Sequence, residues 1–125
     1  MCIRDSSNIL QIAIKPEDRQ LHREYVSKRF LNMMEDGLIG EVERILNLKG
    51  MSKNSQSMKS VGYRQVCQFL DGDYGRDDMI KKAINSTRQL AKRQMTWING
   101  WEDLTLVEKN TKLPTDIKNL IVKNL

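Results

Sequence analysis

The spacing of apolar side chains predicts a mainly α chain with two short strands. Apolar positions that recur every three or four residues indicate helices, whose expected ends coincide with glycines or with acidic first turns. These signals predict helices at about 17–36, 39–48, 59–70, 76–99 and 114–124. Alternating isoleucines and a Leu-Thr-Leu-Val run predict strands at 8–14 and 104–107, and a polar, small-residue stretch predicts a loop at 51–58.

The same periodicity predicts the core. In the first two helices the inward positions are expected to be Leu21, Val26, Phe30, Met33, Met34, Ile39, Val42, Ile45 and Leu46. In helix 76–99 they are expected to be Ile80, Ile84, Thr87, Ala91, Met95 and Ile98. Because two isolated strands do not make a stable sheet by themselves, the pattern indicates a piece of a larger fold.

The composition and net charge indicate what kind of binding partner to expect. The 125 residues are 39% hydrophobic and 30% charged, which is typical of a small globular domain or of part of a larger one. The formal net charge is +5 and the isoelectric point is near 9.3. A basic balance of this size favours an acidic partner such as a nucleic acid, a nucleotide or a diphosphate.

Several function classes are disfavoured. A single His22 and two distant cysteines, Cys2 and Cys67, do not supply a zinc site of the usual kind or a hydrolytic triad. The isolated cysteines favour a reducing, cytoplasmic setting. No apolar run approaches the roughly 20 residues that a membrane helix needs, so we expect no membrane association.

Helix 76–99 is the strongest functional signal. Opposite its apolar side lie two polar stripes at helical spacing, formed by Lys81, Asn85, Arg88 and Lys92 and by Lys82, Gln89 and Arg93. No acidic residue lies between Asp78 and Glu102, so these cations lack partners within the helix. Arginine and glutamine side chains can donate to phosphates and base edges, although a merely solvated face remains the alternative.

Each of three other features of the sequence has two possible interpretations. Gly62 could allow close approach to an anion at a helix start or only tight helix packing, and Tyr63 could stack on a base or be core. Trp97 and Trp101 could be core anchors or stacking platforms. Arg29, beside Phe30, could be aimed at a phosphate or be an ordinary surface cation.

Three motifs in this order resemble the bacterial type of tRNA dimethylallyltransferase, also called tRNA isopentenyltransferase. The first is Arg29-x-x-x-Met33-x-x-x-Gly37-Leu38-Ile39-x-Glu41-Val42. The second is Ser60-Val61-Gly62-Tyr63-Arg64-Gln65. The third, and the most specific, is Thr87-Arg88-Gln89-Leu90-Ala91-Lys92-Arg93-Gln94-x-Thr96-Trp97. The resemblance covers about residues 9–101.

The resemblance implies a fold and a reaction. The chain would be the C-terminal part of a P-loop nucleotide-kinase-like α/β fold. The family transfers a dimethylallyl group from dimethylallyl diphosphate to N6 of adenosine 37 in tRNA, with magnesium assisting at the diphosphate. The expected partners are therefore tRNA and dimethylallyl diphosphate, and we expect a cytoplasmic monomer.

The expected site residues are those at positions that match the motifs of the family. Arg29 matches the family's arginine near the diphosphate, where it would stabilise the leaving group. The expected tRNA contacts are Lys59, Ser60, Val61, Gly62, Tyr63, Arg64, Arg88, Lys92, Arg93, Gln94, Thr96 and Trp97. Two positions depart from the family pattern, because Tyr25 and Asn99 stand where many members have arginine.

The family's P-loop and its general-base aspartate match nothing in these residues. We therefore interpret 8–125 as the C-terminal part of the transferase domain, with a magnesium site mainly elsewhere, and expect the isolated chain not to be catalytic. Residues 1–6 match nothing in the family, and residues 1–7 are expected to be an unstructured leader, with both a native and an artificial origin left open. The alternatives are a small nucleic-acid-binding module that uses helix 76–99, or a helical interaction domain whose basic face is only solvated.

Overall fold

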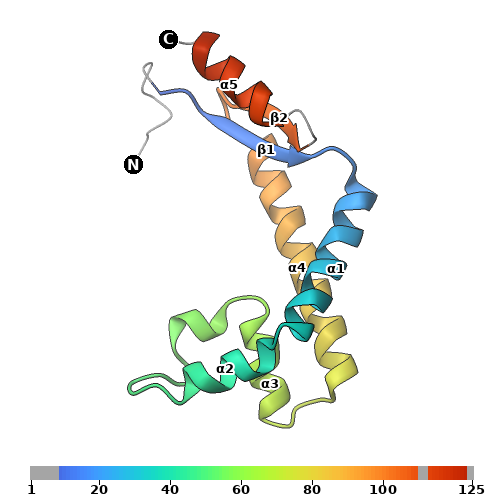
Figure 1. Cartoon of the computed structure of the whole chain (residues 1–125), viewed down its shortest axis with the longest axis vertical. Helices are drawn as coiled ribbons and strands as arrows, with labels where there is room; N and C mark the ends of the chain where they lie inside the picture. The colour runs from blue at the N-terminus through green and yellow to red at the C-terminus, as the bar shows by residue number, and fades with distance from the viewer. Residues whose placement is uncertain (1–8, 110–112, 124–125) are drawn as a thin grey trace. The chain divides into compact units, whose positions relative to one another are not determined.

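A computed structural model describes residues 9–109 and 113–123 of the chain. They form two compact units, one from residues 9–22 with 92–109 and 113–123 and the other from residues 23–91, and each is described by itself. The described elements are β1 (Ile12–Pro16), α1 (Arg19–Glu35), α2 (Leu38–Leu46), η2 (Gln56–Lys59), α3 (Tyr63–Leu70), α4 (Arg76–Asn99), β2 (Thr105–Lys109) and α5 (Leu113–Lys123) (Figure 1). The mainly α chain with two short strands is confirmed, and the helix predicted at 76–99 has the predicted bounds.

The two strands of the first unit pair with each other. β1 and β2 are parallel neighbours, with Ile12 opposite Thr105 and Ile14 opposite Val107. Their pairing begins where the Thr105 N–H donates to the carbonyl of Gln11 at 3.0 Å. Val107 is 6% exposed, whereas its register partner Ile14 on the same face of the sheet is 48% exposed, so the two strands are not covered to the same extent.

The first strand lies later in the chain than predicted. Its expected range, 8–14, was set by the alternating isoleucines, but the parallel register with β2 extends pairing to Pro16. Proline is tolerated at the end of an edge strand, which allows β1 to end at Pro16. The Asp18 carboxylate then caps α1, accepting from the Leu21 N–H at 3.0 Å.

The second unit encloses a core to which α1, α2, η2, α3 and α4 all contribute. Its buried members are Phe30, Met34, Leu38, Val42, Met58, Val66, Cys67, Met79 and Ala83. Val42, Val66, Met79 and Ala83 are fully buried, so α2, α3 and α4 are held against a shared interior. Burial raises the pKa of the Cys67 thiol, as expected for a cysteine that serves as a small apolar side chain.

Several core predictions are corrected. Leu21 is 63% exposed although it was expected to point inward. On α4 the buried side chains are Met79 and Ala83, whereas Ile80 and Ile84 are only partly buried at the edge of the core. The periodicity predicted α4 correctly as a helix. Which of its side chains are buried depends on the elements packed against it, and most of these lie far away in the sequence.

The third helix also begins later than predicted. Residues 59–62 were assigned to it, yet α3 starts at Tyr63, after η2 and a turn. Part of the predicted loop at 51–58 is the one-turn helix η2, which places Met58 in the core with 1% exposure. No described helix is long and apolar enough to cross a membrane.

Truncation of a core side chain on α4 should destabilise the second unit. Met79→Ala should lower the free energy of unfolding by about 2–5 kcal/mol, because a fully buried side chain leaves a cavity. Leu48→Ala is the matched control, since Leu48 is 60% exposed in the same unit and should change stability by less than about 0.5 kcal/mol. Urea denaturation followed by circular dichroism measures both, and equal losses would contradict this core.

Candidate functional site

The turn before α3 explains why glycine stands at position 62. Gly62 has φ 96° and ψ −64°, a conformation that L side chains rarely adopt. A Cβ at Gly62 would meet no atom of the described residues within 4 Å, so tight packing among those residues does not explain this glycine. The Gly62 N–H donates to Gln65 Oε1 at 2.8 Å, and the Arg64 N–H donates to the Ser60 carbonyl at 2.9 Å. The turn is therefore a defined structure rather than a loose connection.

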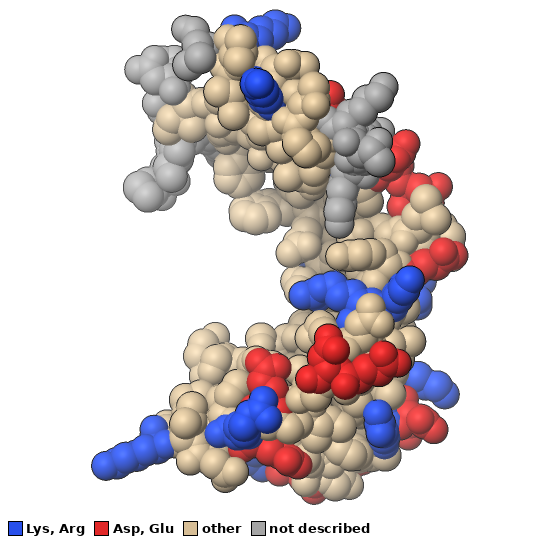
Figure 2. Space-filling model, viewed as in Figure 1, with Lys and Arg blue, Asp and Glu red and all other residues tan. Residues whose placement is uncertain are grey.

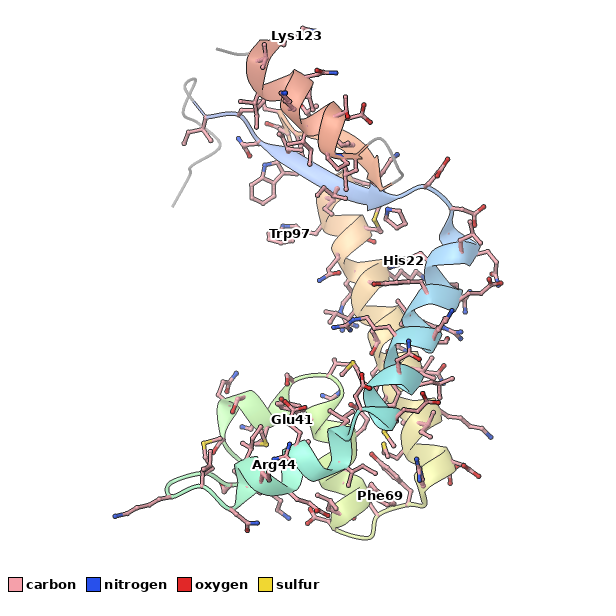
Figure 3. The ribbon with its side chains drawn as sticks, viewed as in Figure 1. His22, Glu41, Arg44, Phe69, Trp97 and Lys123 are labelled. Carbon is pink, nitrogen blue, oxygen red and sulfur yellow. The ribbon has the colours of Figure 1, made fainter. Side chains whose placement is uncertain are left out.

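Tyr63 joins this turn to α2. Its hydroxyl donates to Glu41 Oε1 at 2.8 Å, and its ring is partly buried against the core (Figure 3 labels Glu41 on α2). The hydrogen bond to Glu41, with burial and the negative charge of Glu41 adding to it, raises the pKa of Tyr63. The core interpretation of Tyr63 is therefore met in part, because its ring packs at the edge of the core, and the base-stacking interpretation stays a prediction.

The expected contacts around this turn are mostly accessible. Lys59, Ser60 and Arg64 are exposed, Val61 is half-buried, and Gly62 is buried. On the face drawn in Figure 2, Lys and Arg side chains are interspersed with Asp and Glu side chains over the second unit, so the positive charge on this face is not one continuous patch.

Arg88 does not face outward as predicted. Its guanidinium is partly buried, and the Nη2 atom donates to Ser27 Oγ of α1 at 2.6 Å. Its Nε atom is buried and has no hydrogen-bond partner within the part of the chain that the structure describes. The helical wheel placed Arg88 beside Lys92, but Ser27 of α1 draws it inward.

The last turns of α4 belong to the first unit and do present an exposed polar row. Its exposed members are Lys92, Arg93, Gln94, Thr96, Trp97 and Asn99. Trp97 is 67% exposed and its indole projects away from α4 (Figure 3), so the core interpretation of this residue is wrong. Half-buried Trp101 holds the pair in place, because its Nε1 donates to Gln11 Oε1 and its ring meets Trp97 edge-on at 5.3 Å between centroids.

Arg29 lies on the exposed side of α1. No hydrogen bond or ion pair joins its guanidinium to another described residue, so the structure gives it no inward-facing partner. Over residues 9–109 and 113–123, no three His, Cys, Asp or Glu side chains gather as they would around a metal ion.

Sequence reasoning missed the residues that organise these segments. Gln65 was quoted only as part of a motif, although it is 3% exposed and bonded to the Gly62 N–H. The spacing Gly62-x-x-Gln65 is that of a helix N-cap followed by a polar residue at N3, and this signal could have placed the helix start correctly. The bonds from Ser27 to Arg88 and from Gln11 to Trp101 span 61 and 90 residues, and no local pattern indicates them.

Comparison with known proteins assigns the class. The sequence pattern of the family described as IPP transferase matches residues 3–101, which is most of the chain. The chain therefore belongs to the IPP transferase family.

Particular relatives agree with this assignment. The chain is 40% identical over 119 residues to tRNA dimethylallyltransferase 2 of Hahella chejuensis, covering 94% of this chain but only 36% of that protein. It matches the full-length tRNA isopentenylpyrophosphate transferase from Bacillus halodurans with a TM-score of 0.84 and the corresponding transferase from Staphylococcus epidermidis with 0.78, both at 25% identity. These matches cover 94% of this chain and 39% and 38% of the solved chains. Both solved structures have a P-loop kinase-like fold, which confirms the predicted fold class.

The Tyr63–Glu41 bond makes a prediction about stability and pH. Tyr63→Phe should lower the free energy of unfolding by about 1 kcal/mol near neutral pH, because one hydrogen bond is lost. The folded-state pKa of Tyr63 is raised, so this contribution is complete below the ordinary pKa of 10.0 and is lost as the pH rises through the raised value. Denaturation of both proteins between pH 7 and 11 measures the difference, and a difference that does not shrink at alkaline pH would contradict the bond.

Proposed function

We propose that this chain takes part in tRNA modification, within an enzyme that transfers a dimethylallyl group from dimethylallyl diphosphate to N6 of adenosine 37. The observation that carries the proposal is the 40% identity to a tRNA dimethylallyltransferase over 94% of this chain, in a chain that belongs to the IPP transferase family. The chain spans 36% of that relative, so the activity is proposed for a complete enzyme and not for these residues alone.

The chemistry is a substitution at C1 of the prenyl group. The N6 amine forms a new N–C bond, the C–O bond to the diphosphate breaks, and N6 gives up a proton to a base outside this chain. A stacked and paired base hides its N6, so the adenine is expected to leave its stack before it reacts. Cations held near the departing diphosphate stabilise the charge that it gathers, and Arg29 is proposed for this role. Any magnesium ion in the complete enzyme is proposed to have its ligands outside the described residues.

The RNA-binding part of the proposal rests on exposed groups in each unit. In the second unit Lys59, Ser60 and Arg64 flank the ordered Gly62 turn. In the first unit Lys92 and Arg93 are exposed, and the adjacent Trp97 offers an accessible ring. Cations next to an exposed aromatic ring suit an unpaired, phosphate-bearing strand, because phosphates pair with the cations and bases stack on the ring. Arg88 is partly buried against α1. It is therefore proposed to contact RNA only at the edge of the surface formed by Lys92, Arg93 and Trp97.

A chimeric enzyme tests the proposed function. This chain replaces the matching region of the Hahella chejuensis enzyme, and the chimera receives dimethylallyl diphosphate and an anticodon stem-loop that carries adenosine 37. The chimera should prenylate this RNA, whereas the isolated chain and a stem-loop with guanosine at position 37 should give no product. A correctly folded chimera without activity on the adenosine substrate would contradict the proposal.

Charge reversal in the same chimera tests the RNA surface. Lys92→Glu with Arg93→Glu should weaken stem-loop binding by about tenfold or more and lower the salt dependence of binding, because phosphate contacts are lost. The matched control is Lys118→Glu with Lys123→Glu, which changes the net charge equally at exposed positions of α5. Fluorescence anisotropy at several salt concentrations measures both pairs. Equal losses would favour general electrostatic attraction, and no loss would make the end of α4 a solvated face.

A further inference from the structure

Gln65 is the buried polar side chain that the proposed reaction leaves unexplained. Within the described part of the chain, it is the one polar residue among those classed as buried, with 3% of its surface exposed. Its neighbours on α3, Val66 and Cys67, are core residues. An amide in such a place loses its water, and this costs free energy unless each polar end finds a partner.

Both polar ends of the Gln65 side-chain amide have a hydrogen-bond partner. Oε1 accepts from the Gly62 N–H at 2.8 Å, and Nε2 donates to Ser86 Oγ on α4 at 3.1 Å. The Tyr74 hydroxyl lies 3.0 Å from the Gln65 carbonyl oxygen and 2.7 Å from Gln68 Oε1, so these two acceptors share its one proton. Side chain and backbone together give Gln65 one orientation, with Oε1 aimed at the turn.

The hydrogen bonds of the Gln65 side chain fix the geometry of the Gly62 turn more than they add to the free energy of unfolding. A buried hydrogen-bonded amide has a small net effect on stability, since an apolar side chain of similar shape would avoid the desolvation cost. Its partner in the turn, by contrast, is a glycine, whose backbone can adopt many conformations, so a hydrogen bond helps to select the observed φ of 96° and ψ of −64°. The bond to Oε1 ties the Gly62 amide to the rigid start of α3, and so determines the direction in which the chain enters the helix.

The residues around that amide are those proposed to touch RNA. Ser60 and Arg64 are exposed on either side of Gly62 and are joined by the bond from the Arg64 N–H to the Ser60 carbonyl. A change in the Gly62 conformation would therefore move both together. Tyr63 has a separate anchor in Glu41, so it does not by itself fix the Ser60 side of the turn.

We propose that Gln65 is a positioning residue for RNA binding: through the Gly62 amide it holds Ser60 and Arg64 in their binding arrangement, and Ser86 orients its side chain. Gln65 itself does not reach the RNA. The proposal rests on the proposed function, because it assumes that this turn contacts the anticodon region.

The test compares a conservative and a disruptive variant in the 125-residue chain. Gln65→Glu keeps an acceptor for the Gly62 N–H and can accept from the Ser86 hydroxyl, so stem-loop affinity should stay within about twofold of wild type. Gln65→Met keeps the volume but loses both bonds, and affinity should fall about tenfold at a temperature where circular dichroism shows a folded chain. Ser86→Ala removes only the orienting bond and should cost about threefold.

Hydrogen exchange separates positioning from folding. In Gln65→Met the amides of Gly62 and Arg64 should exchange at least about tenfold faster, while those of the buried α4 segment around Ala83 should be unchanged. Gln65→Glu should restore slow exchange at Gly62. This readout needs no RNA, so it still decides whether Gln65 controls the turn if a failed proposed function leaves the wild-type chain unable to bind the stem-loop.

Three results would overturn the proposal. The first is wild-type affinity in folded Gln65→Met. The second is exchange at Gly62 that is unchanged by loss of the side chain. The third is an affinity loss in Gln65→Glu equal to that in Gln65→Met, with both chains folded, because a positioning role requires rescue by a side chain that keeps the acceptor.

Discussion

Burial of Met79 and Ala83 of α4 against α2 and α3 is the contact on which the second unit depends. These two side chains are fully buried together with Val42 and Val66, so four residues from three helices share one interior. This packing sets the rotation of α4 about its own axis. Once Met79 and Ala83 point inward, Lys81 and Asn85 of α4 must point to solvent. The polar face of the helix is therefore a consequence of its apolar contacts.

Hydrogen bonds between polar groups set the orientation of side chains that the apolar core does not fix. Ser27 draws Arg88 toward α1, Glu41 receives the Tyr63 hydroxyl, and Gln65 ties the Gly62 turn to α4 through Ser86. The exposed ion pair between Lys53 and Asp71, 3.0 Å apart, adds little by comparison, because solvent screens it. Hydrogen bonds with a partly or fully buried partner thus decide which cations are held in place and which stay accessible to an anionic ligand.

How much the sequence predicts follows from the range of the interactions. The bounds of α4 were predicted because periodicity, an acidic first turn and a terminal Asn-Gly are all local signals. The exposure of Lys92 and Arg93 was predicted on the same basis. The inward turn of Arg88 and the exposure of Trp97 were not, since they depend on partners from elsewhere in the chain or on the absence of a covering element. The predicted leader at 1–7 lies outside the described residues.

The site was predicted mainly through family motifs, and the structure adds what the motifs do not specify. A motif names Gly62 and Gln65, whereas the structure shows that the Gly62 N–H donates to Gln65 Oε1 in a positive-φ turn. Likewise, the motif names Trp97, and the edge-on contact with Trp101 shows how an exposed ring is kept in place. The central claim is that residues near this turn and the end of α4, rather than the basic chain as a whole, bind RNA.

Lysine footprinting tests that claim most directly. The chain is acetylated with and without an anticodon stem-loop, and mass spectrometry measures the protection of each lysine. Lys59 and Lys92 should be protected, whereas exposed Lys118 and Lys123 of α5 should react as in the free chain. Equal protection of all four lysines, or protection of the α5 pair alone, would contradict the account.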